Sequence, residues 1–286
     1  MAGVEWVAPS TEDEALRYFS SDPPSAVVPI AGGTDLLLDL EAGRVGPRRL
    51  VSLSRLPWRE LEWAPNALRI GSTRPLADIQ ADPRVRQAVP GLIEAILAVG
   101  GPALRHRATL GGNLARAAPA SDVIPLLLAV GASVELVGAD GHRTVPVDQF
   151  VRASRETALR PGELIRRIVL PVPRPSAYRW HRVRPVNDIS HVAVGGSFDP
   201  GTSEWTVAIG GVPPRPQVER DRTLGARPSD AAIETFARAV AERVPLRGDL
   251  RASEGYRRRV VAILVARTIR AVAMADQIGS DRGSAA

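Results

Sequence analysis

The chain has 286 residues, of which 44% are hydrophobic and 24% charged, as is typical of a globular protein with one large domain or two smaller ones. It contains no cysteine, which excludes disulfides and any iron–sulfur cluster held by its own thiolates. Its net charge is +6, but the 37 basic residues are all arginines and are interleaved with 31 acidic residues, a pattern that indicates compositional bias rather than a nucleic-acid-binding stripe.

The first 55 residues predict a small α/β unit. Its first helix starts at the capping-box pattern Ser10-Thr11-Glu12-Asp13 and ends at Asp22-Pro23-Pro24. The other elements expected here are a strand at 27–30, a short helix from 36 to Gly43, and a strand at 50–53.

Residues 56–175 predict a second α/β unit, closed by the proline-rich stretch 171–175, which favours an extended linker. We therefore expect a domain over 1–175, with subdomains of about 1–55 and 56–175. Its elements are a strand at 68–71, a helix opened by Pro75, a helix through 92–97, a helix around 126–130, and strands at 133–137 and 164–170 about a turn at 139–141.

The C-terminal part, residues 176–286, predicts a compact α+β domain. Three strands are expected, followed by two helices, and the small polar tail from Gly279 to Ala286 is expected to be disordered. The strands span 178–183, 192–198 and 205–209, and the helices span 229–243 and 253–275. The whole chain is thus predicted to be α+β.

No membrane span, export signal or metal site is expected. The longest apolar run, residues 123–130, is short and contains a proline, and the N-terminus lacks the pattern of a signal peptide. We therefore expect a cytoplasmic location. The four histidines show no paired spacing, and no acid–base pair or nucleophile constellation predicts a catalytic residue.

Two Gly-Gly turns are the most informative features of the chain. They lie in the segments Ala31–Leu37 and Thr109–Leu114, each at the end of a short apolar element. Glycine lets a ligand approach the backbone closely, and successive amides form a concave site for phosphate oxygens. Each turn alone is more often a plain tight turn. Together, with the donors and acceptors around them, they predict one dinucleotide site.

The sequence resembles the FAD-binding (medium) subunits of the molybdenum hydroxylases, the family of carbon monoxide and xanthine dehydrogenases. Residues 31–37 resemble the AGGTDLL turn of the family, and residues 105–122 resemble its second signature, roughly VRNRGTIGGNLANASPAAD. Residues 249–258 are similar to its DLRAS…YRR signature. The order and spacing of the three motifs also agree, so the resemblance covers nearly the whole chain.

The resemblance implies a two-part FAD-binding domain of the PCMH type, followed by a small domain with a three-stranded sheet. It also implies one FAD, a molybdopterin-binding large subunit and a small [2Fe-2S] subunit as partners, and a quinone, NAD, oxygen or a protein as the electron acceptor. The cofactor contacts are expected at Ala31, Gly32, Gly33, Thr34, Asp35, Leu36, Thr109, Gly111, Gly112, Asn113, Ala115, Asp122, Leu164 and Trp180.

Each polar candidate also has a structural interpretation. The Thr109 hydroxyl could be satisfied within its own turn, Asn113 could cap the following turn, and Asp35 and Asp122 could each cap the helix that follows. Arg105 and Arg107 could support an anionic cofactor or form solvated salt bridges. The basic residues 257–259 are expected to serve packing and surface charge.

Two positions depart from the family pattern. Pro75 stands where the family usually has a threonine, and Arg179 or Trp180 stands where it often has a lysine near the flavin. These departures bear on the redox properties of the flavin. The predicted function is an FAD-binding electron-transfer subunit, and the alternatives are a stand-alone flavoenzyme and a nucleotide-binding scaffold without chemistry.

Overall fold

The structure is a computed structural model that describes residues 3–21, 25–184, 188–212 and 214–283. Asp22-Pro23-Pro24, expected to end the first helix, lies outside these residues. The chain forms two compact units, each assembled from three separate segments. The first unit comprises Met1–Ile79, Gly101–Ala117 and Ser133–Leu170, and the second comprises Gln80–Gly100, Ala118–Ala132 and Pro171–Ala286.

The N-terminal part of the first unit is a three-stranded parallel sheet in the order β1-β3-β2. As the capping-box pattern predicts, the Glu14 amide donates to Thr11 Oγ1 at the start of helix α1, while the Ser10 amide donates to Glu14 Oε2. The elements are β1 (Glu5–Val7), α1 (Glu12–Ser21), β2 (Val27–Ile30), α2 (Leu36–Glu41), β3 (Arg49–Ser52) and η1 (Leu53–Arg55).

The rest of the first unit is built on a five-stranded sheet in the order β4-β5-β10-β6-β7. The short α6 and α7 precede β6 in the chain, and a small β8–β9 ribbon lies between β7 and β10. The elements are β4 (Leu61–Ala64), β5 (Ala67–Gly71), α3 (Leu76–Ala81), α6 (Pro102–Arg105), α7 (Leu110–Arg116), β6 (Ser133–Gly138), β7 (Gly141–Pro146), α9 (Val147–Phe150), β8 (Val151–Ala153), β9 (Glu156–Thr157) and β10 (Leu164–Pro171).

The second unit is built on a four-stranded antiparallel sheet in chain order, β11-β12-β13-β14. The prediction of three strands is wrong by one, because β14 has the polar sequence QVERD, which lacks an apolar run and lies at the sheet edge. The elements are α4 (Pro83–Ala88), α5 (Pro90–Ala98), α8 (Val123–Ala129), β11 (Ser176–His181), β12 (Val192–Asp199), β13 (Glu204–Gly210), β14 (Gln217–Asp221), α10 (Asp230–Arg243) and α11 (Glu254–Gly283).

Helices cover both faces of this sheet, as adjacent glycines of β12 show. A Cβ at Gly195 would meet the backbone of Pro125 and Leu126 in α8, whereas a Cβ at Gly196 would meet Thr268 in α11. Because successive residues of a strand point to opposite faces, α8 and α11 lie on opposite sides of the sheet. Strand β12 is accordingly buried over seven of its eight residues.

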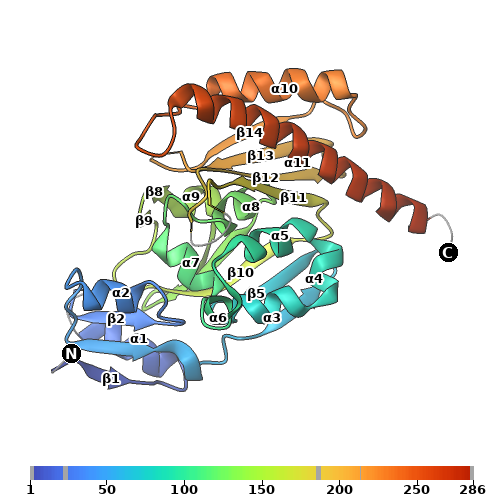
Figure 1. Cartoon of the computed structure of the whole chain (residues 1–286). Coiled ribbons are helices and arrows are strands. Elements are labelled where there is room, and N and C mark those ends of the chain that lie inside the picture. The colour runs from blue at the N-terminus through green and yellow to red at the C-terminus, as the bar shows by residue number, and fades with distance from the viewer. Residues whose placement is uncertain (1–2, 22–24, 185–187, 213, 284–286) are drawn as a thin grey trace. The chain divides into compact units, whose positions relative to one another are not determined.

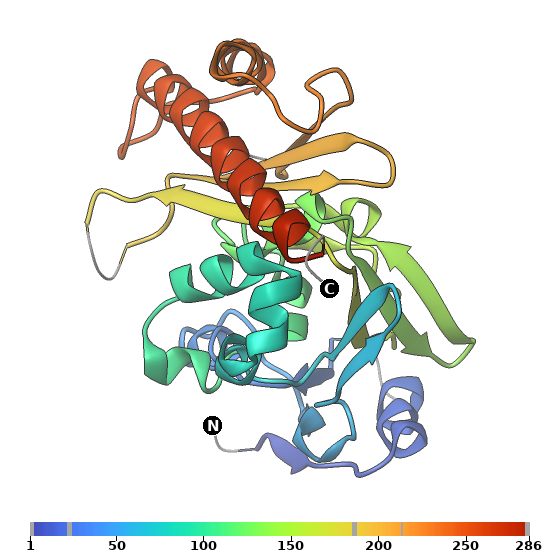
Figure 2. The same ribbon diagram turned by 90° about the vertical axis from the view of Figure 1, so that its right-hand side faces the viewer.

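Helices α10 and α11 pack together over one face of the sheet (Figure 1), and α11 crosses the strands (Figure 2). Their apolar faces form a core with the sheet that includes Trp205, Val207 and Val265. Helix α11 continues to Gly283 and so includes the first five residues of the tail expected to be disordered. No helix among the described residues is long and apolar enough to span a membrane.

We predict that Gly195→Ala destabilises the protein. The new Cβ would lie 2.6 Å from the carbonyl oxygen of Pro125 and 2.7 Å from Leu126 Cα, both backbone atoms that cannot rotate away, so overpacking should cost about 1–3 kcal/mol. Gly255→Ala is the matched control, because its Cβ has open space in a helix. Equal free energies of unfolding by urea titration for the two variants would contradict the close packing of α8 on β12.

Candidate functional site

Both Gly-Gly turns line one pocket of about 360 Å³ in the first unit, a volume within the range of small-molecule sites. The first turn follows β2 and leads into α2, while the second lies in α7. Ten of the fourteen expected contact residues line this pocket. They are Ala31, Gly32, Gly33, Thr34, Asp35, Leu36, Thr109, Gly112, Asn113 and Ala115.

The first turn presents open backbone donors. None of the described residues accepts a hydrogen bond from the amides of Gly33, Thr34 or Asp35. Gly33 adopts φ +75°, a left-handed conformation that glycine reaches without strain. The Asp35 side chain forms no cap bond to α2, so the capping interpretation of Asp35 is wrong. This turn can therefore supply several N–H groups to an anion.

The amides of the second turn are already hydrogen-bonded, to Thr109 within the turn and to Ser72 outside it. Gly111 N donates to Ser72 O at 3.1 Å, Gly112 N to Thr109 Oγ1 at 3.0 Å, and Asn113 N to Thr109 O at 3.0 Å. The hydroxyl of Thr109 thus caps α7, as its structural interpretation predicts. The expectation that both turns offer free amides holds for the first turn only. The second turn contributes a surface without side chains, because a Cβ at Gly112 would meet only Thr109 Oγ1, at 3.0 Å.

The first turn is in direct backbone contact with Arg107 and Ala108, the two residues just before the second turn. A Cβ at Gly32 would lie 1.9 Å from the carbonyl oxygen of Arg107 and 3.2 Å from Ala108 Cα, so only glycine fits at this position. Arg107 Nη2 also donates to the Gly32 carbonyl at 3.5 Å, a role outside the two expected for this side chain. This contact joins two segments that are about 75 residues apart in the sequence. Both segments line the pocket.

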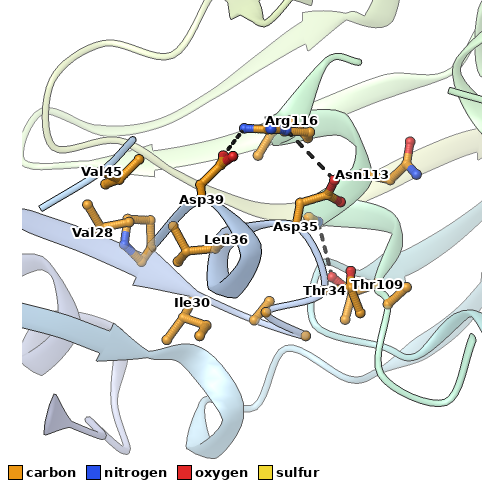
Figure 3. Close-up of a pocket in the computed structure, with 17 residues that line it drawn as sticks. Val28, Ile30, Thr34, Asp35, Leu36, Asp39, Val45, Thr109, Asn113 and Arg116 are labelled. Carbon is orange, nitrogen blue, oxygen red and sulfur yellow. Dashed lines mark hydrogen bonds and ion pairs between the residues drawn. The ribbon is translucent and has the colours of Figure 1, made fainter. Parts of the chain in front are cut away.

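The charged side chains of Asp35, Asp39 and Arg116 form one wall of the pocket (Figure 3). Arg116 Nη1 donates to Asp39 Oδ2 at 2.5 Å, and its Nε lies 3.8 Å from Asp35 Oδ1. Asp39 is 3% exposed and also accepts from Arg44 Nη1 at 2.8 Å. Hydrogen bonds from Arg44 and Arg116 hold the pKa of Asp39 below its usual range, so this carboxylate is charged at neutral pH.

A smaller apolar pocket of about 90 Å³ adjoins the first, since Pro29, Ala31, Gly112 and Ala115 line both. Two further expected residues, Gly111 and Leu164, line the smaller pocket. The remaining lining residues are Leu53, Ser72, Leu159, Glu163 and Ile165.

Asp122 and Trp180, the last two expected residues, belong to the second unit. Asp122 does not cap α8, a role taken by Ser121, whose Oγ accepts from Ile124 N. Its carboxylate accepts from Ser190 Oγ at 2.6 Å, Tyr178 Oη at 2.7 Å and Arg182 Nη2 at 2.9 Å. Burial raises the pKa of Asp122, and these donors oppose the rise.

Trp180, at the position where the family often has a lysine, forms part of an aromatic stack. Its ring lies 5.8 Å from the Tyr178 ring and 5.9 Å from the Arg182 guanidinium carbon, and 38% of the residue is exposed. Its neighbour Arg179 pairs with Glu94 at 2.8 Å. Trp180 is therefore a partly exposed ring that stacks on the buried ring of Tyr178.

Pro75, the other departure from the family pattern, supports the second turn. It forms an isolated β-bridge with Thr109, and the next residue, Leu76, donates its amide to Ala108 O at 2.9 Å. Proline can take this place because the neighbouring amide makes the bond. The hydroxyl of Thr73, two residues earlier, donates to Trp58 O at 2.9 Å.

The C-terminal signature is a structural motif. Asp249 accepts from the amides of Arg251 and Ala252 and from the buried Arg257, which also donates to His191 O at 2.9 Å. The Arg251 amide and the Arg257 guanidinium lower the pKa of Asp249 to about 2. Arg258 donates to Ala241 O and is 26% exposed, so the packing part of the expectation holds for both arginines.

Sequence reasoning did not select two charged residues of the pocket, Asp39 and Arg116. Helical spacing was the available signal, because Asp35 and Asp39 are four residues apart in the α2 segment and Gly112 and Arg116 are four apart in α7. The apolar lining residues Val28, Ile30 and Val45 were also not selected. Among the described residues, no cluster of three metal-ligating side chains occurs.

Comparisons with known proteins place the chain in a family. A family model described as the FAD binding domain in molybdopterin dehydrogenase matches residues 2–173, and a model described as the CO dehydrogenase flavoprotein C-terminal domain matches residues 176–272. The glyceraldehyde dehydrogenase medium chain of Sulfolobus acidocaldarius is 28% identical over 279 residues, which cover 94% of this chain and 98% of that one. The carbon monoxide dehydrogenase medium chain of Hydrogenophaga pseudoflava is 31% identical over 168 residues, 58% of each chain.

Solved structures agree. A chain of the carbon monoxide dehydrogenase of Hydrogenophaga pseudoflava, in a form that lacks the Mo-pyranopterin moiety, superposes with a TM-score of 0.85 and 25% identity, over 95% of this chain and 98% of that one. A chain of quinoline 2-oxidoreductase from Pseudomonas putida 86 shares the fold, with a TM-score of 0.85, 24% identity, and 95% and 97% coverage.

The fold and these matches define the flavoprotein component of an oxidoreductase, with FAD as its cofactor. The chain belongs to the family of FAD-binding subunits of the molybdopterin-dependent dehydrogenases, together with the relatives named above. The family resemblance, the α+β fold class and FAD, all expected from the sequence, are confirmed.

We predict that Gly32→Ala destabilises the first unit even without cofactor. Its Cβ would lie 1.9 Å from the Arg107 carbonyl oxygen, and the turns could accommodate it only by moving apart, at a cost of about 1–3 kcal/mol. Gly46→Ala, whose Cβ meets no atom within 4 Å, is the control in thermal unfolding of the cofactor-free protein. A Gly32→Ala variant as stable as this control would show that the turns do not touch.

Proposed function

We propose that the pocket between the two Gly-Gly turns holds the pyrophosphate of FAD, and that the chain passes electrons from iron–sulfur clusters of a partner through this flavin to an external acceptor. The observation that carries the proposal is the set of open amides of the first turn beside the side-chain-free surface of the second. Backbone N–H groups in such a concavity bind phosphate oxygens.

The described residues fit the parts of FAD. The amides of Gly33 and Thr34 would donate to the pyrophosphate, and Gly112 would let it approach the second turn. The apolar pocket beside Leu164 offers a place for a flat, uncharged part of the cofactor. Asp122 and Trp180 of the second unit remain proposed contacts. When bound, FAD supplies the capacity to take up and release electrons, while the protein binds and orients it.

Two observations support the proposed partners: the sequence has no cysteine, and its relatives are named as medium chains of dehydrogenases. It has no cysteine for a cluster, so the thiolate ligands of an iron–sulfur relay would lie outside these 286 residues. Relatives are named medium chains of glyceraldehyde and carbon monoxide dehydrogenases. We infer a molybdopterin-binding large subunit and a [2Fe-2S] small subunit, with a quinone, NAD, oxygen or a protein as the acceptor.

We also propose that the FAD-binding domain ends at about residue 175. The two family models support this boundary, because one match ends at residue 173 and the next begins at residue 176. The prolines between them favour an extended connection.

We predict that the purified chain binds one FAD per protomer, and that Gly112→Val weakens this binding about 10- to 150-fold, equivalent to the loss of one hydrogen bond to a charged group. A valine side chain at Gly112 would project into the pocket. Gly101→Val is the matched control, because it has open space around its Cβ and an extended backbone. Calorimetric titration that finds no FAD binding by the unaltered chain would refute the proposed site.

We predict that the isolated chain, loaded with FAD, is not reduced by organic substrates of the dehydrogenase. Reduction, followed as loss of flavin absorbance, should become fast when molybdenum and iron–sulfur subunits are co-expressed, because their clusters would deliver the electrons. Co-purification from the native host tests the same point. A lone chain that oxidises a small molecule with oxygen or NAD would instead establish a stand-alone flavoenzyme.

A further inference from the structure

Arg116 lies one helical turn after the second Gly-Gly turn, and its side chain lines the pocket with 24% exposure. Residues four apart in a helix share a face, so Arg116 and Gly112 are on the same side of α7. The guanidinium reaches over to α2, where it meets the carboxylates of Asp39 and Asp35 (Figure 3). It is therefore a cation in the wall of the pocket proposed above for the pyrophosphate.

The buried carboxylate of Asp39 holds the Arg116 guanidinium in place. The carboxylate is 5% exposed as a side chain and is shared between Arg116, at 2.5 Å, and Arg44, at 2.8 Å. Both arginines favour its charged form. A long arginine side chain held in this way has lost its rotational freedom before any ligand arrives, which reduces the entropic cost of binding.

The guanidinium keeps donors for another acceptor. Arginine carries five N–H donors, and among the described residues the Arg116 guanidinium makes one hydrogen bond, to Asp39. The 3.8 Å separation between Arg116 Nε and Asp35 Oδ1 is longer than a hydrogen bond. Asp35 is 60% exposed and can turn towards water.

We propose that Arg116, positioned by Asp39, is an additional anchor for the pyrophosphate of FAD, an inference that rests on the proposed function above. The planar guanidinium matches phosphate oxygens with paired N–H groups. It supplies the positive charge that the neutral amides of the first turn lack. It also offsets two carboxylates, Asp35 and Asp39, that would otherwise face an anionic cofactor with uncompensated negative charge.

The contrasting role is a structural strut, in which the Asp39–Arg116 pair only joins α2 to α7. A strut would alter the stability of the cofactor-free protein but not the electrostatic part of FAD binding. An anchor would alter the response of the FAD dissociation constant to salt, since mobile ions screen charge–charge attraction. Salt dependence therefore separates the two roles.

The test compares Arg116→Gln with Arg44→Gln. Both variants remove one arginine from the same carboxylate, but Arg44 does not line the pocket and is 61% exposed. FAD dissociation constants are measured by calorimetry at low and high sodium chloride, alongside thermal unfolding without FAD. Arg116→Lys, which keeps the charge but loses the planar fork, is the conservative variant.

Arg116→Gln is expected to bind FAD about 10- to 150-fold more weakly at low salt, with a smaller salt dependence than the unaltered protein. Arg44→Gln should keep the affinity and the salt dependence, and Arg116→Lys should restore part of both. Equal FAD affinity and equal salt dependence in Arg116→Gln and the unaltered chain would overturn the inference and leave the FAD site standing. Failure of the unaltered chain to bind FAD would instead overturn the proposed function.

Discussion

The backbone contact at Gly32 is the constraint on which the pocket depends. The first turn meets the segment Arg107–Ala108 with no room for a side chain. The Leu76 amide donates to the carbonyl of Ala108 in that segment, and Gly111 of the adjoining second turn donates to Ser72 O. The shape of the pocket is therefore set by contacts between main-chain atoms in the region of the five-stranded sheet, and the lining side chains project from this backbone.

Within this frame the two turns have different roles. The amides of the second turn are used by Thr109 and Ser72, so this turn is rigid and offers shape. The first turn keeps its amides open and offers hydrogen bonds. The second turn is rigid and the first turn has open amides, so together they can bind an anion with little rearrangement. The entropic cost of ordering both backbones has already been met during folding. In the same way, Asp39 holds the Arg116 side chain in place before a ligand binds, which lowers the entropic cost of binding.

Much of this arrangement could be predicted from the sequence, and the misses have physical reasons. Glycine pairs and apolar runs are local signals, so both turns and most strands were found. Polar edge strands such as β14, QVERD, carry no such signal. The sequence also could not show that the Gly112 amide is already bonded, since this depends on the rotamer of Thr109. Arg116 was missed because its importance comes from Asp39, which is 77 residues away.

The helices α5 and α8 come from the N-terminal half of the sequence, yet they are buried on the C-terminal sheet. Gly91 N donates to Ser176 Oγ, Ser197 Oγ donates to Ala129 O, and the Tyr178 amide donates to Glu94. The sequence boundary near residue 175 therefore does not divide the hydrophobic cores. A gene fragment ending there would leave the apolar faces of both helices in water, where they would promote aggregation. The second compact unit therefore needs helices from the first family segment as well as the sheet of the second.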